Sequence, residues 1–122
     1  MDTIHNMLRK RLLAQAGVLE PSDPAPSLDE IYKMQWSAEF EQLMRNRLAM
    51  GFFRYGPLPK QIGCHKYDNL GSIEKRLSIY KESKNRELLV DIANLALVEF
   101  VVHPEHPFKA VDDGVHAERL KR

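Results

Sequence analysis

The chain has 122 residues, and its 18 Lys and Arg against 17 Asp and Glu give a formal net charge of +1. This length suits one domain, and so balanced a charge gives no general electrostatic preference for nucleic acid or an anionic membrane. The lone Cys64 cannot form an internal disulfide, and no apolar run approaches the roughly 20 residues of a membrane span or forms a signal-peptide core. We therefore expect a soluble, cytoplasmic, single-domain protein.

The first predicted element is a short amphipathic helix over residues 3–16, which ends at Gly17. Its apolar positions recur at helical spacing: Ile4, Met7, Leu8 and Leu12. Three prolines follow in "EPSDPAPS", and proline lacks a backbone donor and disfavours helix in the residue before it. Residues 1–26 are therefore predicted to be an accessory helix and an extended connector, which packs on the main body or on another subunit.

One long helix is predicted over residues 27–50, at the start of a core domain that runs to residue 103. Ser27 and Glu30 form a capping-box signature, no glycine or proline interrupts the pattern, and Gly51 ends it. Apolar residues share one side of this helix: Trp36, Phe40, Leu43 and Met44.

Residues 54–71, "RYGPLPKQIGCHKYDNLG", are rich in glycine and proline and are predicted to form an irregular loop. Long loops in compact domains are often functional. Its basic and aromatic side chains suit an anionic, aromatic ligand, and the alternative is an ordinary solvated loop. The candidate ligand-binding residues are Arg54, Tyr55, Lys60, His65, Lys66 and Tyr67.

Two further helices are predicted over residues 72–82 and 85–102, joined by the short turn "SKN" as an antiparallel hairpin. Asn85 is a good N-cap, and Glu87 in the first turn is favoured by the helix dipole. Residues 104–122 are predicted to be an irregular polar tail. In the region from residue 103 on, His103, His106, His116, Asp112 and Asp113 are potential transition-metal ligands, although their spacing fits no standard structural-zinc pattern.

The last predicted helix is apolar around its whole circumference, which is typical of a helix surrounded by protein. Glu87, Asp91 and Asn94 fall at i, i+4 and i+7, on one stripe of it. A buried carboxylate without a partner costs several kcal/mol, so Asp91 must meet a cation. Two interpretations stay open, namely an ion pair with Arg45 or Arg76 and a hard cation such as Mg²⁺.

Two stretches, "EQLMRNRLAMGFFRYG" and "DIAN", resemble the MazG-like all-α NTP pyrophosphohydrolase superfamily, in the style of its small phage-encoded members. The resemblance implies a helical, oligomeric protein that hydrolyses nucleoside triphosphates to monophosphate and pyrophosphate with Mg²⁺. Asp91 and Asn94 match the last motif of that family, and Arg45, Asn46 and Gly51 match its basic segment.

Two features depart from the family pattern. The acid that the family places three residues before the Asp is Leu88 here, with Glu87 one step further back, a rotation of about 100° around a helix. The helical "ExxE" motif is also missing, because Glu74 and Glu82 lie eight residues apart.

The sequence thus predicts an all-α bundle of one long helix and a helix hairpin, forming a homodimer or higher oligomer with the last helix near the interface. The predicted function is Mg²⁺-dependent NTP or dNTP pyrophosphohydrolysis, with Mg²⁺ on Glu87 and Asp91. The alternatives are nucleotide binding without chemistry and a structural or interaction module with a salt-bridged Asp91. The predicted catalytic residues are Glu41, Glu74, Glu87 and Asp91. The predicted substrate-binding residues are Arg45, Asn46, Arg54, Tyr55, Lys66, Arg76 and Asn94.

Overall fold

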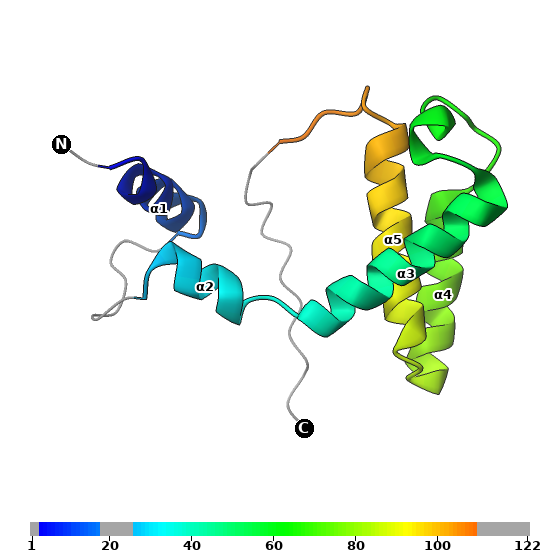
Figure 1. The fold of residues 1–122 in the computed structure, drawn as a ribbon, viewed down its shortest axis with the longest axis horizontal. Helices are drawn as coiled ribbons and strands as arrows, with labels where there is room; N and C mark the ends of the chain where they lie inside the picture. Colours follow the sequence, from blue (N-terminus) through cyan, green and yellow to red (C-terminus); the bar gives the residue numbers. More distant parts are fainter. Residues whose placement is uncertain (1–2, 18–25, 110–122) are drawn as a thin grey trace. The chain divides into compact units, whose positions relative to one another are not determined.

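The computed structural model describes residues 3–17 and 26–109, and every regular element in them is a helix (Figure 1). The predicted all-α class is therefore confirmed. The described chain divides into two compact units. Unit 2 is Ser37–Pro107, whereas the core domain predicted from the sequence spans residues 27–103. Unit 1 contains the described residues that precede and follow unit 2 in the sequence.

Parts of three predictions lie outside the described residues. They are the proline-rich connector over residues 18–25, the tail from residue 110 onward, and the three potential metal ligands in that tail: Asp112, Asp113 and His116.

Unit 1 contains two short helices. α1 is Ile4–Gln15, close to its predicted bounds. α2 is Leu28–Met34, and Ser27 caps it as predicted, because the Ser27 hydroxyl accepts a backbone hydrogen bond in the first turn at 3.2 Å. Leu28 is buried, and its N–H donates to the Nε2 atom of His5 at 3.4 Å. This hydrogen bond joins α2 to α1.

The single long helix predicted over residues 27–50 is wrong, because the chain leaves helical geometry after Met34. After three intervening residues, a second helix, α3, begins and spans Ala38–Tyr55. Ser37 caps it, since the Ser37 hydroxyl accepts a hydrogen bond from the N–H of Phe40 at 3.1 Å. Two glutamates in the first turn of α3 add a favourable interaction with the helix dipole. The apolar pattern continues across this break, but Ser37 starts a new helix within it, so the predicted helix is two helices.

Gly51 does not end α3, contrary to the prediction. A glycine inside a helix costs only about 1 kcal/mol relative to alanine, which the packing of a longer helix offsets. The stop is Gly56, whose φ of 82° and ψ of −172° suit glycine far better than any residue with a Cβ.

The predicted loop over residues 54–71 is shorter and more ordered than expected. It contains the 3₁₀ helix η1, Leu58–Gln61, and its end belongs to α4, Asn69–Ser83. α4 starts before the predicted position because Asp68 caps it. The Asp68 carboxylate accepts a hydrogen bond from the N–H of Gly71 at 2.9 Å.

α5 is Glu87–Val102, and it lies beside α4 after a short turn, so the predicted antiparallel hairpin is confirmed (Figure 1). The N-cap predicted at Asn85 is one residue early, because Arg86 holds the N-cap position of α5 and no side chain caps it. The Asn85 side chain instead accepts a hydrogen bond from the N–H of Glu87 at 3.1 Å, in a turn that precedes the helix. α3 crosses α5, and η1 also contacts α5. No described helix, α5 included, combines the length and the apolar character that a membrane span requires.

The core of unit 2 is small. Among its described residues only Val90, Asn94 and Val102 are buried, and all three belong to α5. Phe100 on the same helix is 70% exposed, and Phe53 on α3 is 85% exposed. The neighbours of α5 within unit 2 therefore cover only part of its apolar circumference.

Candidate functional site

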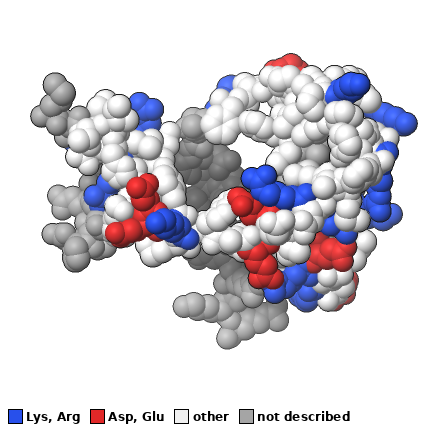
Figure 2. Space-filling view, in the orientation of Figure 1, with Lys and Arg blue, Asp and Glu red and all other residues white. Residues whose placement is uncertain are grey.

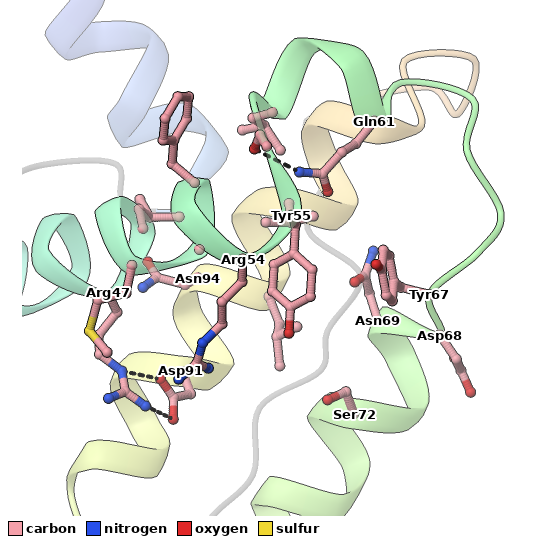
Figure 3. Close-up of a pocket in the computed structure, with 18 of the residues that line it drawn as sticks. Arg47, Arg54, Tyr55, Gln61, Tyr67, Asp68, Asn69, Ser72, Asp91 and Asn94 are labelled. Atoms are coloured by element: carbon pink, nitrogen blue, oxygen red, sulfur yellow. Dashed lines mark hydrogen bonds and ion pairs between the residues drawn. The ribbon is translucent and has the colours of Figure 1, made fainter.

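Four elements of unit 2, α3, η1, α4 and α5, surround a pocket of about 510 Å³ (Figure 3). This volume lies within the range of about 300–1,000 Å³ that is usual for small-molecule sites. Polar and aromatic side chains from all four elements line it, together with Tyr67 and Asp68 from the segment that precedes α4. Basic and acidic side chains are interspersed on the face of unit 2 that Figure 2 shows, and no large patch of one charge marks this face. The charge of the pocket is therefore set by the individual residues that line it.

The central interaction in this pocket is a bidentate ion pair between Arg47 of α3 and Asp91 of α5. Arg47 donates through Nε to Asp91 Oδ1 at 3.0 Å and through Nη2 to Asp91 Oδ2 at 3.1 Å. The same Nη2 lies 3.0 Å from Glu87 Oε1. Hydrogen bonding to Asp91 raises the pKa of Arg47 above its ordinary value, and the charges of both carboxylates add to this against the opposing effect of burial. The Arg47 guanidinium thus joins both carboxylates to α3.

Arg76 of α4 also approaches the Asp91 carboxylate. Its Nε lies 4.0 Å from Asp91 Oδ2, and its Nη1 donates to the Ser72 carbonyl oxygen at 3.3 Å and to the Ser72 hydroxyl. Asp91 therefore lies between guanidinium groups from two helices, bonded to Arg47 and at a longer ion-pair distance from Arg76.

Arg54 is the third arginine of the pocket lining. It points from α3 into the pocket, and within the described residues it makes no hydrogen bond or ion pair (Figure 3). The lining thus carries three arginines and the two carboxylates of Asp68 and Asp91, and Glu87, outside the lining, also pairs with Arg47. Arg54 is the arginine of the lining that pairs with no described carboxylate, and its guanidinium suits an anionic ligand.

Aromatic rings form another part of the lining. The rings of Tyr55 and Tyr67 meet edge to face, with centroids 5.1 Å apart, and both side chains keep about half of their surface exposed. Lys66 Nζ lies 5.4 Å from the centroid of the Tyr67 ring, although Lys66 itself does not line the pocket. Half-exposed aromatic rings of this kind can stack on a planar ligand.

Asn94 contributes a buried amide to the same lining. It is 7% exposed, and its Nδ2 donates to the carbonyl oxygen of Met44 at 3.0 Å. This bond joins α5 to α3. Its Oδ1 is buried without a hydrogen-bond partner among the described residues. A buried acceptor of this kind costs about 1–3 kcal/mol.

The structure gathers only some of the predicted site residues. Six of them line the pocket: Arg54, Tyr55, Tyr67, Arg76, Asp91 and Asn94. Glu87 does not line it but reaches it through Arg47. Arg45 pairs with Glu41 at 3.9 Å and Asn46 accepts a hydrogen bond from Gln42 at 2.9 Å, both at the surface of α3, and Glu74 is exposed on α4.

The predicted magnesium ligands do not fit the ion in this arrangement. Glu41, Glu74, Glu87 and Asp91 form no metal-sized cluster within the described part of the chain. Glu87 and Asp91 converge, but the Arg47 guanidinium bonds to both of them and takes the place that the ion requires. Of the two interpretations of Asp91, the ion pair is the one formed, with Arg47 as the main partner and Arg76 as the more distant one.

Arg47 is the functional residue that the sequence reasoning missed. Once α3 extends to Tyr55, Arg47 and Arg54 stand seven residues apart and share one face of the helix. Met44, whose carbonyl oxygen binds Asn94, lies one turn before Arg47 on the same face. The available signal was the i, i+3 and i+10 spacing of Met44, Arg47 and Arg54. It was missed because a helix that ends at Gly51 does not include Arg54.

No protein-family model, curated protein or solved structure matches this chain.

Proposed function

We propose that unit 2 binds a nucleoside phosphate in the pocket between α3, η1, α4 and α5, and that binding does not require hydrolysis. The observation that carries the proposal is the presence of three arginines and two tyrosines around one pocket of about 510 Å³. Guanidinium groups pair with phosphate oxygens, often through two parallel hydrogen bonds, and tyrosine rings stack on nucleobases.

The ion pairs inside the pocket support phosphate binding by holding the arginines in place. Asp91 holds Arg47 through two hydrogen bonds and Ser72 holds Arg76, so part of the entropic cost of ordering these long side chains is met before a ligand arrives. Arg54 has no partner within the described residues, so its guanidinium is available to a phosphate group. The buried Oδ1 of Asn94 offers an acceptor to a ligand N–H or O–H group after a small rearrangement of the lining.

Mg²⁺-dependent pyrophosphohydrolysis, which the family resemblance implies, is the second candidate. The observation that favours it is the convergence of Glu87 and Asp91 on one cation, each with an oxygen 3.0 Å from Arg47. Against it stands the occupation of that position by Arg47 itself. The two candidates share one ligand class and differ in whether products form.

Titration calorimetry with a panel of NTPs and dNTPs, with and without Mg²⁺, tests the proposal, and chromatography of the mixtures detects hydrolysis. Arg54→Ala removes the available guanidinium and should weaken binding by about 10–100-fold, because a hydrogen bond to a charged group contributes about 1.5–3 kcal/mol. Arg45→Ala is the matched control, since it removes an exposed arginine of the same helix that lies outside the pocket. Equal affinity of the two variants, or no binding by the parent, would contradict the proposal.

We also infer that the protein is a homodimer or a higher homo-oligomer, with α5 near the interface. The support is the small core of unit 2 and the exposure of large apolar side chains on each of its α helices, among them Phe53, Leu70 and Phe100. A second copy that covered this surface would supply the burial that unit 2 lacks.

A further inference from the structure

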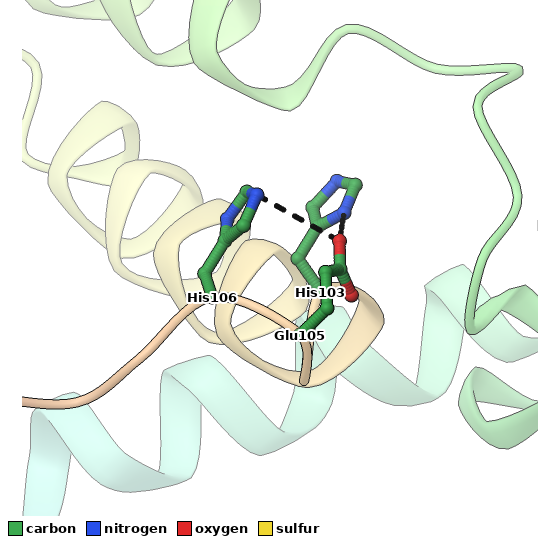
Figure 4. A group of neighbouring side chains, drawn as sticks. All are labelled: His103, Glu105 and His106. Atoms are coloured by element: carbon green, nitrogen blue, oxygen red, sulfur yellow. Dashed lines mark hydrogen bonds and ion pairs between the residues drawn. The ribbon is translucent and has the colours of Figure 1, made fainter.

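The chain turns sharply where α5 ends, in the sequence "HPEHP" at His103–Pro107. The N–H of His106 donates to the carbonyl oxygen of His103 at 3.1 Å, which closes the turn. The proline after His103 restricts the backbone further. As a result, the side chains of His103, Glu105 and His106 project to the same side (Figure 4). None of the three lines the pocket proposed for the nucleoside phosphate.

The donor atoms of this turn lie close together. His103 Nδ1 is 2.8 Å from Glu105 Oε1, and His106 Nε2 is 3.7 Å from the same oxygen. One ligand atom from each residue falls within 4.8 Å of the other two. Two ligands bound at about 2.1 Å to one tetrahedral ion stand about 3.4 Å apart, a value between the two measured distances.

We propose that His103, Glu105 and His106 bind one transition-metal ion of the Zn²⁺ class, through one nitrogen of each histidine and one oxygen of the carboxylate. Two imidazoles and a carboxylate are ligands that Zn²⁺, Ni²⁺, Co²⁺ and Cu²⁺ accept, whereas Mg²⁺ and Ca²⁺ prefer all-oxygen sets. Three protein ligands leave a coordination position for water. The side chains of Glu105 and His106 are 58% and 67% exposed, so small rotations bring them onto the ion without any change in the core.

The surroundings of His103 support this assignment. When Nδ1 binds a metal, the opposite ring nitrogen, Nε2, keeps its proton and commonly donates a hydrogen bond to an outer carboxylate. Glu99 of α5 lies close to that position, with Oε1 at an ion-pair distance of 3.6 Å from His103 Nε2, and Asn69 of α4 donates to Glu99 Oε1 at 3.3 Å. The ring of His65 stacks against His103, with centroids 5.7 Å apart. His103 is therefore held on both sides in an orientation that directs Nδ1 to Glu105.

Glu105 supplies the oxygen ligand of the set. Its Oε1 faces a ring nitrogen of each histidine, so the carboxylate and both imidazoles are directed to one place.

Titration of the tag-free, metal-stripped full chain with ZnCl₂ in a calorimeter tests the proposal. We expect saturation at one Zn²⁺ per chain, and a Co²⁺ complex with the visible absorption of a low-symmetry site. Loss of an outer-shell partner typically weakens metal binding by about 10–100-fold. His106→Ala and Glu105→Gln each remove a direct ligand, so each should weaken Zn²⁺ binding by at least about tenfold. Glu99→Gln should weaken it by about tenfold, because it alters the outer shell alone.

Two matched controls are His5→Ala, in unit 1, and His116→Ala, beyond the described residues; both should retain the affinity of the parent. Circular dichroism without metal verifies that each variant folds. A titration with MgCl₂ should give the same heat with the parent and with His106→Ala. The proposal is overturned if the parent shows no saturable Zn²⁺ binding. It is equally overturned if His106→Ala and Glu105→Gln bind as the parent does, or if the loss occurs in His116→Ala alone.

Discussion

Replacing Asp91 with asparagine removes one charge from the centre of the pocket while it keeps the shape of the side chain. In the parent, Asp91 accepts two hydrogen bonds from Arg47 at 3.0 and 3.1 Å, and Arg76 lies 4.0 Å away. In Asp91→Asn, the amide group can accept only one of the two bonds, and its NH₂ faces the donors of Arg47. A guanidinium is thus left with an incomplete set of partners.

The expected cost follows from the burial of the two groups. Removing one partner of a fully buried ion pair costs about 3–5 kcal/mol. The Asp91 side chain is only 18% exposed, but Arg47 is 35% exposed and keeps Glu87 at 3.0 Å, so solvent and a second carboxylate compensate part of the loss. We therefore expect Asp91→Asn to lower the free energy of unfolding by about 2 kcal/mol. In a unit of this size, that corresponds to a fall of about 10 °C in the melting temperature.

Thermal and urea unfolding of both proteins in metal-free buffer measures this difference. Glu41→Gln is the control, because it removes an exposed carboxylate whose pairing with Arg45 spans 3.9 Å, and such pairs contribute at most about 1 kcal/mol. The opposite outcome is expected if Asp91 holds Mg²⁺, since loss of its charge would relieve repulsion with Glu87 in the metal-free protein. A mutant as stable as the parent, together with a parent whose melting temperature rises with Mg²⁺, would refute the ion-pair argument.

Three further predictions concern the backbone, the assembly and the C-terminal turn. Gly56→Ala should lower stability by about 1–3 kcal/mol because of its positive φ, whereas Gly51→Ala, with open space around its Cβ position, should raise it by up to about 1 kcal/mol; chemical denaturation without ligand compares them. Light scattering should give the parent a mass of at least twice 14.1 kDa, and Phe100→Glu on α5 should reduce it, while a parent mass of one chain would contradict the inferred oligomer. The Glu105 carboxyl should titrate below the ordinary glutamate value of 4.5 when followed by NMR, so the stability that its ionised form contributes is present above that value and lost as the pH falls through the folded-state pKa. Glu105→Gln should therefore differ from the parent in stability near neutral pH and converge with it in acid.

Helix starts and the hairpin followed from short-range chemistry. Ser27 accepts the backbone hydrogen bond predicted for it, because a capping side chain acts on an N–H only two or three residues away. Asn85 lies one residue before the N-cap of α5, so the predicted helix start was off by that single residue. The same physics explains the errors at Ser37 and Gly56. At Ser37 the alternative was a helix that continues through the apolar pattern, and at Gly56 the alternative was a helix that ends at Gly51. Such alternative helix boundaries differ by about 1 kcal/mol, so tertiary packing selects between them.

The sequence by itself determined that Asp91, inside so apolar a helix, needs a cationic partner, because the cost of burying an unpaired carboxylate does not depend on the fold. Only the tertiary structure decided that the main partner is Arg47 and not Arg45. The two arginines are two residues apart on α3, which places them about 200° apart around the helix axis, so the face of α3 that packs on α5 selects one of them. That face is set by contacts across 44 residues of sequence, and no local pattern encodes the rotation of one helix against another.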